Sequence, residues 1–376
     1  MAKKVIFYTL QTFSTTGGIQ KMARTLAHSL HQLSLRNKWD FKLWSAYDST
    51  DDLMPQYLPA ENFVGFGKNR ISFVLKTIGM TKKPDIIIIS HINLAIIGLL
   101  IKAINPKCKV WLIAHGIEVW RPLSFLKSLF LKRCDKIICV SNFTKQQMIS
   151  RHQTDPSICT VLNNAVDPFM KMPVTFTKPD HLLKRYHLTG KDPILFTLTR
   201  LASTEQYKGH DQVIKVISRL KNKFPGIKYI LSGQYDDKEE IRIQKLITAN
   251  KVHEQVILTG FIEENELTDH FLLADLFVLP SKKEGFGIVF IEALACGLPV
   301  VCGNTDGSID AICNGELGKA INPDDIDELE KVIDEYLKTS LTEDKRQLLQ
   351  DKCLLHFNEH DYMNNLDKLF NNEPIG

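Results

Sequence analysis

Two glutamates eight residues apart lie in a segment suited to binding a sugar-containing ligand. Glu284 belongs to the glycine-rich loop at 281–287, which follows the apolar run Leu276–Leu279. Glu292 lies in the next segment, whose apolar residues recur with helical spacing. A strand, a glycine-rich loop and a helix in this order present backbone amides that bind phosphate or sugar oxygens. Carboxylates accept hydrogen bonds from hydroxyl groups, so this pair predicts contacts to two sugar rings of one ligand.

Two basic residues lie in an earlier loop of the same kind. Arg200 and Lys208 follow the apolar run Ile194–Leu198, and the loop ends in Tyr-Lys-Gly-His-Asp before a helical pattern. A guanidinium fork and an ammonium group suit a diphosphate and would stabilise the negative charge of a departing nucleotide. Glu205 lies between the two basic residues and could instead pair with either of them.

The N-terminal half offers a glycine pair and a histidine. Gly17-Gly18 opens the first helical segment, but it lacks the Gly-x-Gly-x-x-Gly pattern that a dehydrogenase would have. His115 follows the apolar run 110–114, where it could donate to a sugar hydroxyl or a developing oxyanion, or could be purely structural. Asn93 and Glu118 are further candidates on the acceptor side.

Alternating apolar runs and helical segments must position these residues. The runs predict two parallel sheets covered by helices, with strands near 4–10, 41–45, 86–90, 110–114, 136–140 and 160–162, then 194–198, 228–231, 256–259, 276–279 and 299–302. Prolines 168, 173 and 179 indicate an interdomain linker. We therefore expect an N-terminal domain at 1–172 and a C-terminal domain at 173–355. The segment 354–370 has a helical pattern, and a C-terminal helix at 356–376 could pack back on the N-terminal domain.

Over nearly its whole length the sequence resembles the retaining glycosyltransferases of family 4, also called glycosyl transferases group 1, which have a Glu-x7-Glu signature that Glu284 and Glu292 match. The matching motifs are dense only from about Phe196 to Gly318. The resemblance implies an α/β protein of the GT-B fold, with two Rossmann-like domains whose parallel sheets face across a cleft. It also implies transfer of a hexose-type sugar from a nucleotide-diphosphate donor to an acceptor hydroxyl, with retention of configuration. The acceptor would be a cell-surface polysaccharide or a glycolipid.

The resemblance also assigns roles to individual residues. The donor-binding set that it implies is Gly18, Arg200, Lys208, Ile262, Glu284, Phe286, Gly287, Ile288 and Glu292, and the catalytic set is His115, Arg200, Lys208 and Glu284. Within these sets, Glu292 would bind the ribose, and Glu284 with the amides of 286–288 would contact the sugar and phosphates. The backbone of Ile262 would meet the nucleobase.

Three other interpretations compete with this one. A sugar-nucleotide epimerase of the same architecture would act on the donor alone, and a non-catalytic protein would bind the donor without turnover. A glycosidase is poorly supported, because the two glutamates fit a nucleotide site better. We expect no cofactor and no metal, and we interpret Asp236-Asp237 as the start of a solvated helix.

Charge is distributed unevenly along the chain. Residues 1–175 hold 23 Lys and Arg against 10 Asp and Glu, a net charge of +13, and the remainder has 24 against 33, a net charge of −9. The segment Trp120–Cys134 interleaves apolar and basic residues, so it could rest on an anionic membrane or simply pack on the N-terminal sheet. We expect a cytoplasmic protein that could associate with the inner face of the cell membrane, binds no nucleic acid, and keeps its eight cysteines as buried thiols.

Overall fold

The computed structural model describes residues 2–80, 84–339 and 341–374. The chain forms two compact units, one made of Met1–Phe169 with Phe357–Gly376 and the other of Met170–His356. The expected boundaries after residues 172 and 355 lie close to these positions. The first 169 residues and the last 20 thus belong to the same unit, although a whole domain separates them in the sequence.

The first unit contains a parallel sheet of seven strands within the described residues, in the order β3-β2-β1-β4-β5-β6-β7. All its neighbouring strands pair in parallel. The strands are β1 (Lys4–Thr9), β2 (Asp40–Ser45), β3 (Phe63–Gly65), β4 (Ile86–Ile89), β5 (Lys109–Ala114), β6 (Lys136–Cys139) and β7 (Cys159–Val161). The strand order reverses between β1 and β4, so the loops that follow these two strands lead away in opposite directions.

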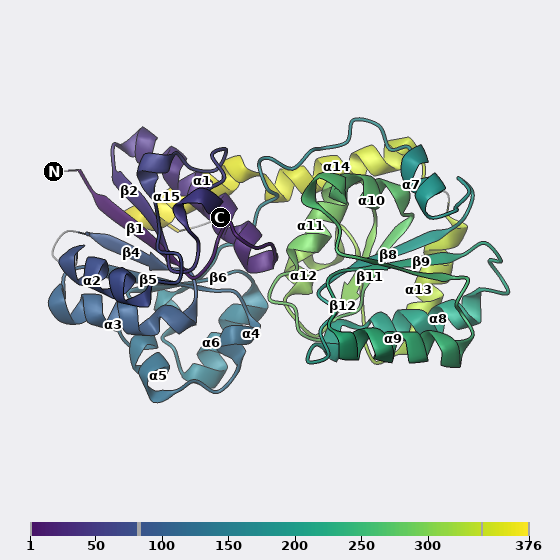
Figure 1. Cartoon of the computed structure of the whole chain (residues 1–376), viewed down its shortest axis with the longest axis horizontal. Coiled ribbons are helices and arrows are strands. Elements are labelled where there is room, and N and C mark those ends of the chain that lie inside the picture. The colour runs from purple at the N-terminus through teal and green to yellow at the C-terminus, as the bar shows by residue number, and fades with distance from the viewer. Residues whose placement is uncertain (1, 81–83, 340, 375–376) are drawn as a thin grey trace. The chain divides into compact units, whose positions relative to one another are not determined.

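Helices cover both faces of this sheet (Figure 1). They are α1 (Gly18–Asn37), α2 (Arg70–Met80), α3 (Ala95–Ile104), α4 (Ile117–Trp120), α5 (Phe125–Leu131), α6 (Asn142–His152) and α15 (Glu359–Asn371). Helices α1 and α15 lie on one face, and α2, α3 and α5 lie on the other. The first helical segment expected after Gly17-Gly18 is α1, whose apolar residues at helical spacing from Met22 to Leu33 are buried.

The second unit repeats this architecture around a parallel sheet of six described strands, in the order β10-β9-β8-β11-β12-β13. The strands are β8 (Ile194–Leu198), β9 (Lys228–Ser232), β10 (Val256–Gly260), β11 (Leu276–Leu279), β12 (Val300–Gly303) and β13 (Lys319–Ile321). The helices are α7 (Asp180–Arg185), α8 (His210–Leu220), α9 (Asp237–Asn250), α10 (Leu267–Leu273), α11 (Ile288–Ala295), α12 (Ser308–Ala311), α13 (Ile326–Lys338) and α14 (Glu343–Phe357). Helices α8, α9 and α13 cover one face, and α10, α11 and α14 cover the other (Figure 1).

The predicted fold class of two parallel, Rossmann-like sheets is confirmed, and each of the eleven expected strands is present within one residue or so of its expected ends. The sequence analysis missed β3 and β13. Both are three residues long, and each lies at the edge of its sheet, where a short strand leaves little periodic pattern to detect.

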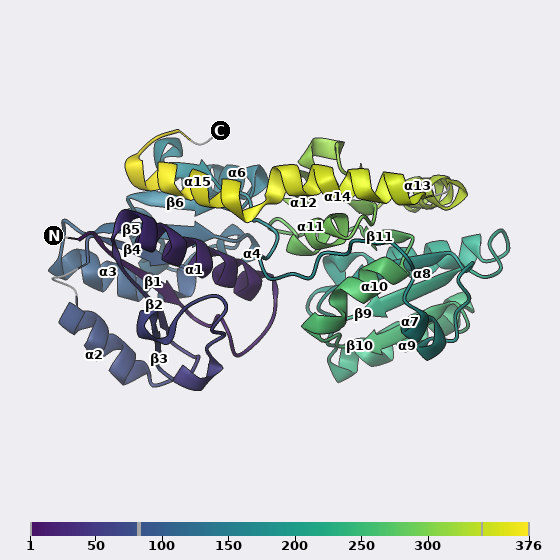
Figure 2. The same cartoon turned by 90° about the horizontal axis from the view of Figure 1, so that it is seen from above.

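The segment 354–370 is helical as expected except at Asn358, which divides it between the end of α14 and the helix α15 (Figure 2). The side chain of Asn358 accepts a hydrogen bond from the amide of Asp361 and so caps the start of α15. Helix α14 bonds within the second unit, where Arg346 donates to the carbonyl of Ala274. The apolar spacing continues across the break, which is why periodicity alone does not reveal it.

Helix α15 completes the first unit, as the expectation of a C-terminal segment packing back on the N-terminal domain implies. Its Phe370 ring lies 4.5 Å from the ring of Trp39 and 4.6 Å from that of Trp111. At its other end Glu359 accepts hydrogen bonds from His28 and Ser29 on α1, at 2.6 and 3.0 Å. The last helix is therefore part of the N-terminal core.

We predict that Phe370→Ala lowers the free energy of unfolding of the first unit by about 3–5 kcal/mol, because it leaves a cavity between two tryptophan rings. Urea titration followed by tryptophan fluorescence measures the change. Leu35→Ala removes an exposed side chain on α1 and is expected to change stability by less than about 0.5 kcal/mol. Equal stability of the two variants would contradict the packing role of α15.

Candidate functional site

The second unit brings two loops together where its strand order reverses, between β8 and β11. A Cβ atom at Gly209 would lie 2.3 Å from the carbonyl oxygen of Pro280, and Gly209 has a left-handed φ of +86°. Only glycine fits this conformation and this approach without strain. The amide of Lys282 also donates to the carbonyl of Tyr207 at 3.0 Å. These contacts hold the loop after β8 against the loop after β11.

The approach of the loops joins Lys208 to Glu284, two of the predicted site residues. The Nζ atom of Lys208 lies 2.5 Å from Oε1 of Glu284, and the two side chains are only 11% and 15% exposed. Burial lowers the pKa of Lys208, but the charge of Glu284 and its hydrogen bond outweigh burial, so the pKa is raised overall. Lys208 therefore remains a cation, and an ammonium group with one bond to Glu284 keeps further N–H donors for an anion.

Asp306, after β12, holds the loop that carries Glu284. Its Oδ2 accepts a hydrogen bond from the amide of Glu284 at 2.6 Å, and its Oδ1 accepts one from the amide of Ser308 at 2.9 Å. The amide of Gly307 donates to the carbonyl of Glu284 at 2.8 Å. Asp306 and Gly307 lie just after β12, where an Asp-Gly pair could also form an ordinary turn. In the structure this pair forms hydrogen bonds to both the amide and the carbonyl of Glu284.

Burial raises the pKa of Asp306 to about 7, and the nearby charge of Glu284 contributes in the same direction. Hydrogen bonds from backbone amides oppose these effects and favour the ionised form. The carboxyl group of Asp306 therefore changes charge near neutral pH. When it is protonated, one of its two oxygens no longer serves as a full acceptor for the loop.

The segment after Glu284 turns into helix α11 as predicted. Gly287 has a φ of +83°, and a Cβ there would lie 2.5 Å from a ring carbon of Phe290. The side chain of Phe286 is buried, so a ligand can meet this residue only through its backbone. Ile288 begins the helix, and Glu292 lies one turn later with a buried side chain. Helix α11 therefore presents its first amides from a rigid, apolar setting.

Arg200 is far more exposed than Lys208 and Glu284. Its side chain is 70% exposed and forms an ion pair with Glu205. The alternative that Glu205 pairs with one of the two basic residues is thus observed, and Arg200 is its partner. Ile262, which follows β10, is buried. The interpretation of Asp236 as a helix start is confirmed, since its side chain accepts from the amide of Glu239 and caps α9.

In the first unit the glycine pair follows β1, at the reversal between β1 and β4. Gly17 precedes α1 in an extended conformation, and α1 begins at Gly18. A Cβ atom at Gly18 would meet no described atom within 4 Å, and one at Gly17 would meet only the end of the Gln20 side chain. The packing of the unit itself does not require glycine at position 18. Space therefore remains beside the first turn of α1.

His115 lies at the end of β5, as predicted, but its hydrogen bonding changes the chemistry expected of it. Its Nε2 atom lies 2.7 Å from the carbonyl oxygen of Ser90, which can only accept, so Nε2 carries the proton. Burial lowers the pKa of His115 to about 4, against the opposing effect of the Ser90 carbonyl, so the ring is neutral at pH 7. The other nitrogen, Nδ1, is then an acceptor. The expectation that His115 donates is corrected: this ring accepts.

Asn93 and Glu118 lie among other polar residues at the carboxyl ends of β4 and β5. Glu118 accepts hydrogen bonds from the amides of His115 and Gly116 at 2.7 and 3.2 Å, and burial raises its pKa. The side chain of Asn93 accepts from Nζ of Lys127 at 2.6 Å. The topology therefore gathers the expected acceptor-side residues at the sheet edge that carries His115.

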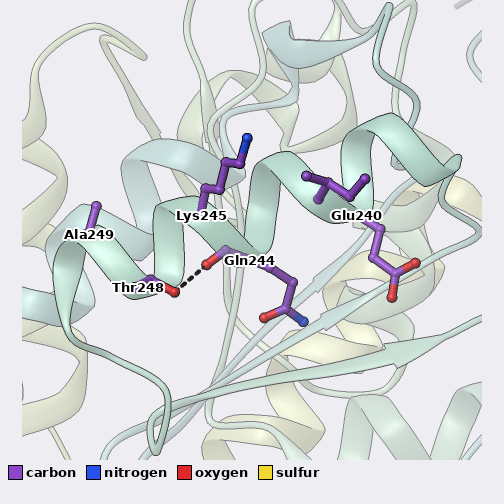
Figure 3. A pocket seen from close by; sticks show the side chains of 6 residues that line it. Glu240, Gln244, Lys245, Thr248 and Ala249 are labelled. Atoms are coloured by element: carbon purple, nitrogen blue, oxygen red, sulfur yellow. Dashed lines mark hydrogen bonds between the residues drawn. The ribbon is translucent and has the colours of Figure 1, made fainter.

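A separate shallow pocket lies on α9 of the second unit (Figure 3). It is lined by Glu240, Ile241, Gln244, Lys245, Thr248 and Ala249, all from this one helix. It contains none of the predicted site residues. Among the described residues, no group of three or more His, Cys, Asp or Glu side chains could hold a metal ion. No helix in the described ranges is long and apolar enough to cross a bilayer.

Two doubly wound units with polar loops at the carboxyl ends of their strands define a GT-B α/β protein. Two family models match the chain: the Glycosyltransferase Family 4 model over residues 16–168 and the Glycosyl transferases group 1 model over residues 181–351. The chain belongs to family 4 of the glycosyltransferases, also called glycosyl transferases group 1.

Relatives of known activity are similar over part of their length. The GDP-mannose-dependent alpha-(1-6)-phosphatidylinositol monomannoside mannosyltransferase of Mycobacterium tuberculosis is 29% identical over 235 residues, which is 59% of this chain and 59% of that protein. A human phosphatidylinositol N-acetylglucosaminyltransferase component is 27% identical over 183 residues, 48% of this chain and 34% of that one. The matches thus span less than two thirds of the length of these curated relatives.

Solved structures show the same fold over nearly the whole chain. A crystal structure of HepE from Anabaena in complex with UDP has a TM-score of 0.78 at 17% identity and covers 98% of this chain and 100% of that one. Sucrose-phosphate synthase from Thermosynechococcus elongatus has a TM-score of 0.76 at 17% identity, with 98% of each chain covered. At this level of identity the similarity establishes the GT-B fold and carries no further assignment.

We predict that Asp306→Asn removes a pH dependence of stability. The folded pKa of about 7 lies above the ordinary value of 3.8, so the folded state binds the proton more tightly and wild-type stability falls as pH rises from about 4 to 7. Between pH 5 and pH 8 the wild type is expected to lose about 1–3 kcal/mol relative to Asp306→Asn. Urea unfolding at the two pH values measures this difference.

The exposed Asp327, in the same unit, supplies the matched control. Asp327→Asn is expected to leave the pH profile of the wild type unchanged. A profile for Asp306→Asn that runs parallel to that of the wild type would contradict the raised pKa.

Proposed function

We propose that this protein is a retaining glycosyltransferase that moves a hexose from a nucleoside-diphosphate donor to a hydroxyl group of a lipid-linked or cell-surface glycan acceptor. The Lys208–Glu284 pair at the strand-order reversal of the second unit carries the proposal. In doubly wound sheets, ligands bind at the carboxyl ends of the strands beside such a reversal. Membership of family 4 supports the class of reaction.

On the donor side, we propose one protein group for each part of the nucleotide sugar. The free N–H donors of Lys208 and the first amides of α11 would bind the diphosphate. Glu292 would accept hydrogen bonds from the ribose, and Glu284 from the transferred sugar. The backbone of Ile262 would contact the base, and the backbone of Gly18 would contact the phosphates. These contacts need no metal and no cofactor, because Lys208 and backbone amides supply the compensating charge.

Arg200 would join the diphosphate by exchanging partners. The Arg200 side chain is 70% exposed, whereas that of Glu205 is only 13% exposed, so solvent screens the guanidinium side of their pair. A diphosphate carries more negative charge than one carboxylate and offers a bidentate partner to the guanidinium group. The departing nucleotide would thus be stabilised by Arg200 together with Lys208.

The proposed reaction follows the front-face course that family membership suggests. The acceptor hydroxyl attacks the anomeric carbon on the side from which the diphosphate departs, and the diphosphate takes the proton, so configuration is retained. No side chain of the chain is assigned as a nucleophile. His115 would assist by accepting a hydrogen bond from a sugar hydroxyl at Nδ1, because its Nε2 proton is held by Ser90.

The names of the relatives guide the choice of donor and acceptor. The mycobacterial protein is a GDP-mannose-dependent enzyme of a phosphatidylinositol monomannoside, and the human protein is part of a phosphatidylinositol N-acetylglucosaminyltransferase. HepE was crystallised with UDP. We therefore propose a UDP- or GDP-sugar as donor and a glycolipid as acceptor, with His115, Asn93 and Glu118 on the acceptor side.

A lipid acceptor requires contact with a membrane, and the first unit exposes a suitable surface. On α5, Phe125 is 79% exposed and Leu126 is also exposed. On α2, Ile71, Leu75 and Ile78 are exposed as well. Basic residues accompany them, in line with the +13 charge of residues 1–175. We propose peripheral contact with the cytoplasmic face of the cell membrane through these two helices.

We predict that the wild type binds UDP or GDP and that Glu292→Ala and Lys208→Ala each weaken this binding about 10- to 100-fold, as loss of a charged hydrogen-bond partner does. Thermal-shift screening against UDP, GDP, ADP, CMP and dTDP identifies the nucleotide, and calorimetry gives the affinities. Lys245→Ala, in the pocket on α9, is the matched control and is expected to bind as the wild type does.

Turnover separates transfer from the rival activities. With the matching UDP- or GDP-sugar, release of nucleoside diphosphate is expected only when a phosphatidylinositol glycolipid or another glycan acceptor is present. Conversion of the donor without an acceptor would indicate an epimerase. Tight binding with no turnover on any acceptor would indicate a binding protein, and unchanged affinity in both natively folded variants would contradict the site.

We also predict that the wild type floats with vesicles of phosphatidylcholine and phosphatidylglycerol, and that Phe125→Ser with Leu126→Ser abolishes flotation. The substitutions remove the exposed apolar contact, and added salt should weaken wild-type binding by screening the basic residues. Ile241→Ser, at an exposed position of the second unit, should float as the wild type does. Flotation of the double variant, or none of the wild type, would reject this surface.

A further inference from the structure

A buried carboxylate accepts hydrogen bonds from successive backbone amides of the loop between β1 and α1. Asp48, just after β2, is fully buried. It accepts hydrogen bonds from the amides of Thr12, Phe13 and Ser14 at 2.7, 3.2 and 3.0 Å, and from the hydroxyl of Ser14 at 2.5 Å. Successive backbone amides turned toward one point form a concavity that binds anions. Here the protein supplies that anion itself.

A buried guanidinium group holds the carbonyls of the same loop. Arg24, on α1, is buried and donates from Nε to the carbonyl of Thr12 and from Nη2 to that of Thr15, both at 2.9 Å. Thr12 is thus held through its amide by Asp48 and through its carbonyl by Arg24. Its hydroxyl also donates to the hydroxyl of Thr9, the last residue of β1, at 2.9 Å.

These bonds connect the loop to β1, β2 and α1. Ser45, at the end of β2, donates to Asp48 at 2.7 Å and so fixes the carboxylate. Burying a carboxylate and a guanidinium is costly unless each is well hydrogen-bonded. Here most of the hydrogen-bond partners described for the two groups are backbone atoms of one loop, and the hydroxyls of Ser14 and Ser45 add to them. The arrangement therefore specifies the path of that loop, whereas an apolar filling would leave its peptide groups without partners.

We propose that Asp48 and Arg24 are positioning residues that hold residues 11–17 in one conformation, so that Gly18 and the first turn of α1 are ready to receive the diphosphate of the donor. The amides of residues 12–14 are occupied by Asp48, so the ligand meets only the part of the loop from Thr15 to Gly18. A loop fixed before binding loses little conformational freedom when the ligand arrives. The inference rests on the phosphate contact proposed for Gly18.

The first test needs no ligand. Hydrogen–deuterium exchange of the intact protein reports on the amides of Thr12, Phe13 and Ser14, and Asp48→Asn leaves an NH2 group where at least one of them needs an acceptor. Their exchange is expected to accelerate about tenfold or more. Asp40→Asn lies at the other end of β2, on an exposed side chain that faces Lys4, and is expected to leave this exchange unchanged.

The second test asks what the fixed loop does. Calorimetry with UDP and GDP, and with UMP and GMP, is expected to show that Asp48→Asn weakens binding of the preferred diphosphate about tenfold, and that of the matching monophosphate by much less. A purely structural role would lower the melting temperature of the variant but leave the affinity of its folded fraction as in the wild type. Arg24→Lys, which keeps the charge but not the fork, is expected to act in the same direction.

The outcomes separate this inference from the proposed function. A wild type that binds neither diphosphate defeats the proposed function and, with it, the assigned purpose of the loop, whatever the exchange data show. A wild type that binds a diphosphate, with a variant that exchanges faster yet binds equally well, overturns only the positioning role. Unchanged exchange in Asp48→Asn, or failure of both variants to fold, also overturns it, because the two residues would then not act on the loop in particular.

Discussion

The contact between the backbones at Gly209 and Pro280 is the constraint on which the candidate donor site depends. Because β8 and β11 are neighbours at the reversal of strand order, the loops after them can approach, and a residue without a Cβ allows the backbones to meet. The approach joins Lys208 to Glu284 in a largely buried pair. A larger residue at 209 would separate the loops and, with them, the two charges.

Buried carboxylates serve a common purpose in the two units. Asp306 accepts a hydrogen bond from the backbone amide of Glu284. Asp48 accepts hydrogen bonds from three backbone amides of the loop that leads to Gly18. In both, a charge that is costly to bury is satisfied by backbone donors and so fixes a loop that side-chain packing alone would not define. Arg200 contrasts with them, since its side chain is 70% exposed beside Glu205, so solvent screens its guanidinium group and a ligand can reach it.

The sequence predicted most of the fold and located the loops of the candidate donor site for a clear physical reason. Apolar periodicity and turn residues are local signals, so the strands, helix α1 and the loop from Glu284 to α11 could be located directly. Where a local sequence pattern is compatible with two structures, the sequence alone could not decide between them. The apolar spacing of 354–370 gave no sign that Asn358 ends one helix and caps the next, and the loop composition could not decide which basic residue Glu205 pairs with.

By itself, the sequence determined the two Rossmann-like units, the family, and the loops that hold Lys208, Glu284 and Glu292, because each depends on neighbours along the chain. Only the tertiary structure decided which residues meet. It placed α15 in the first unit, turned Nε2 of His115 toward Ser90, and closed Asp48 and Arg24 around the glycine loop. These contacts join segments far apart in the sequence, and their geometry follows from strand order and packing, which no local pattern encodes.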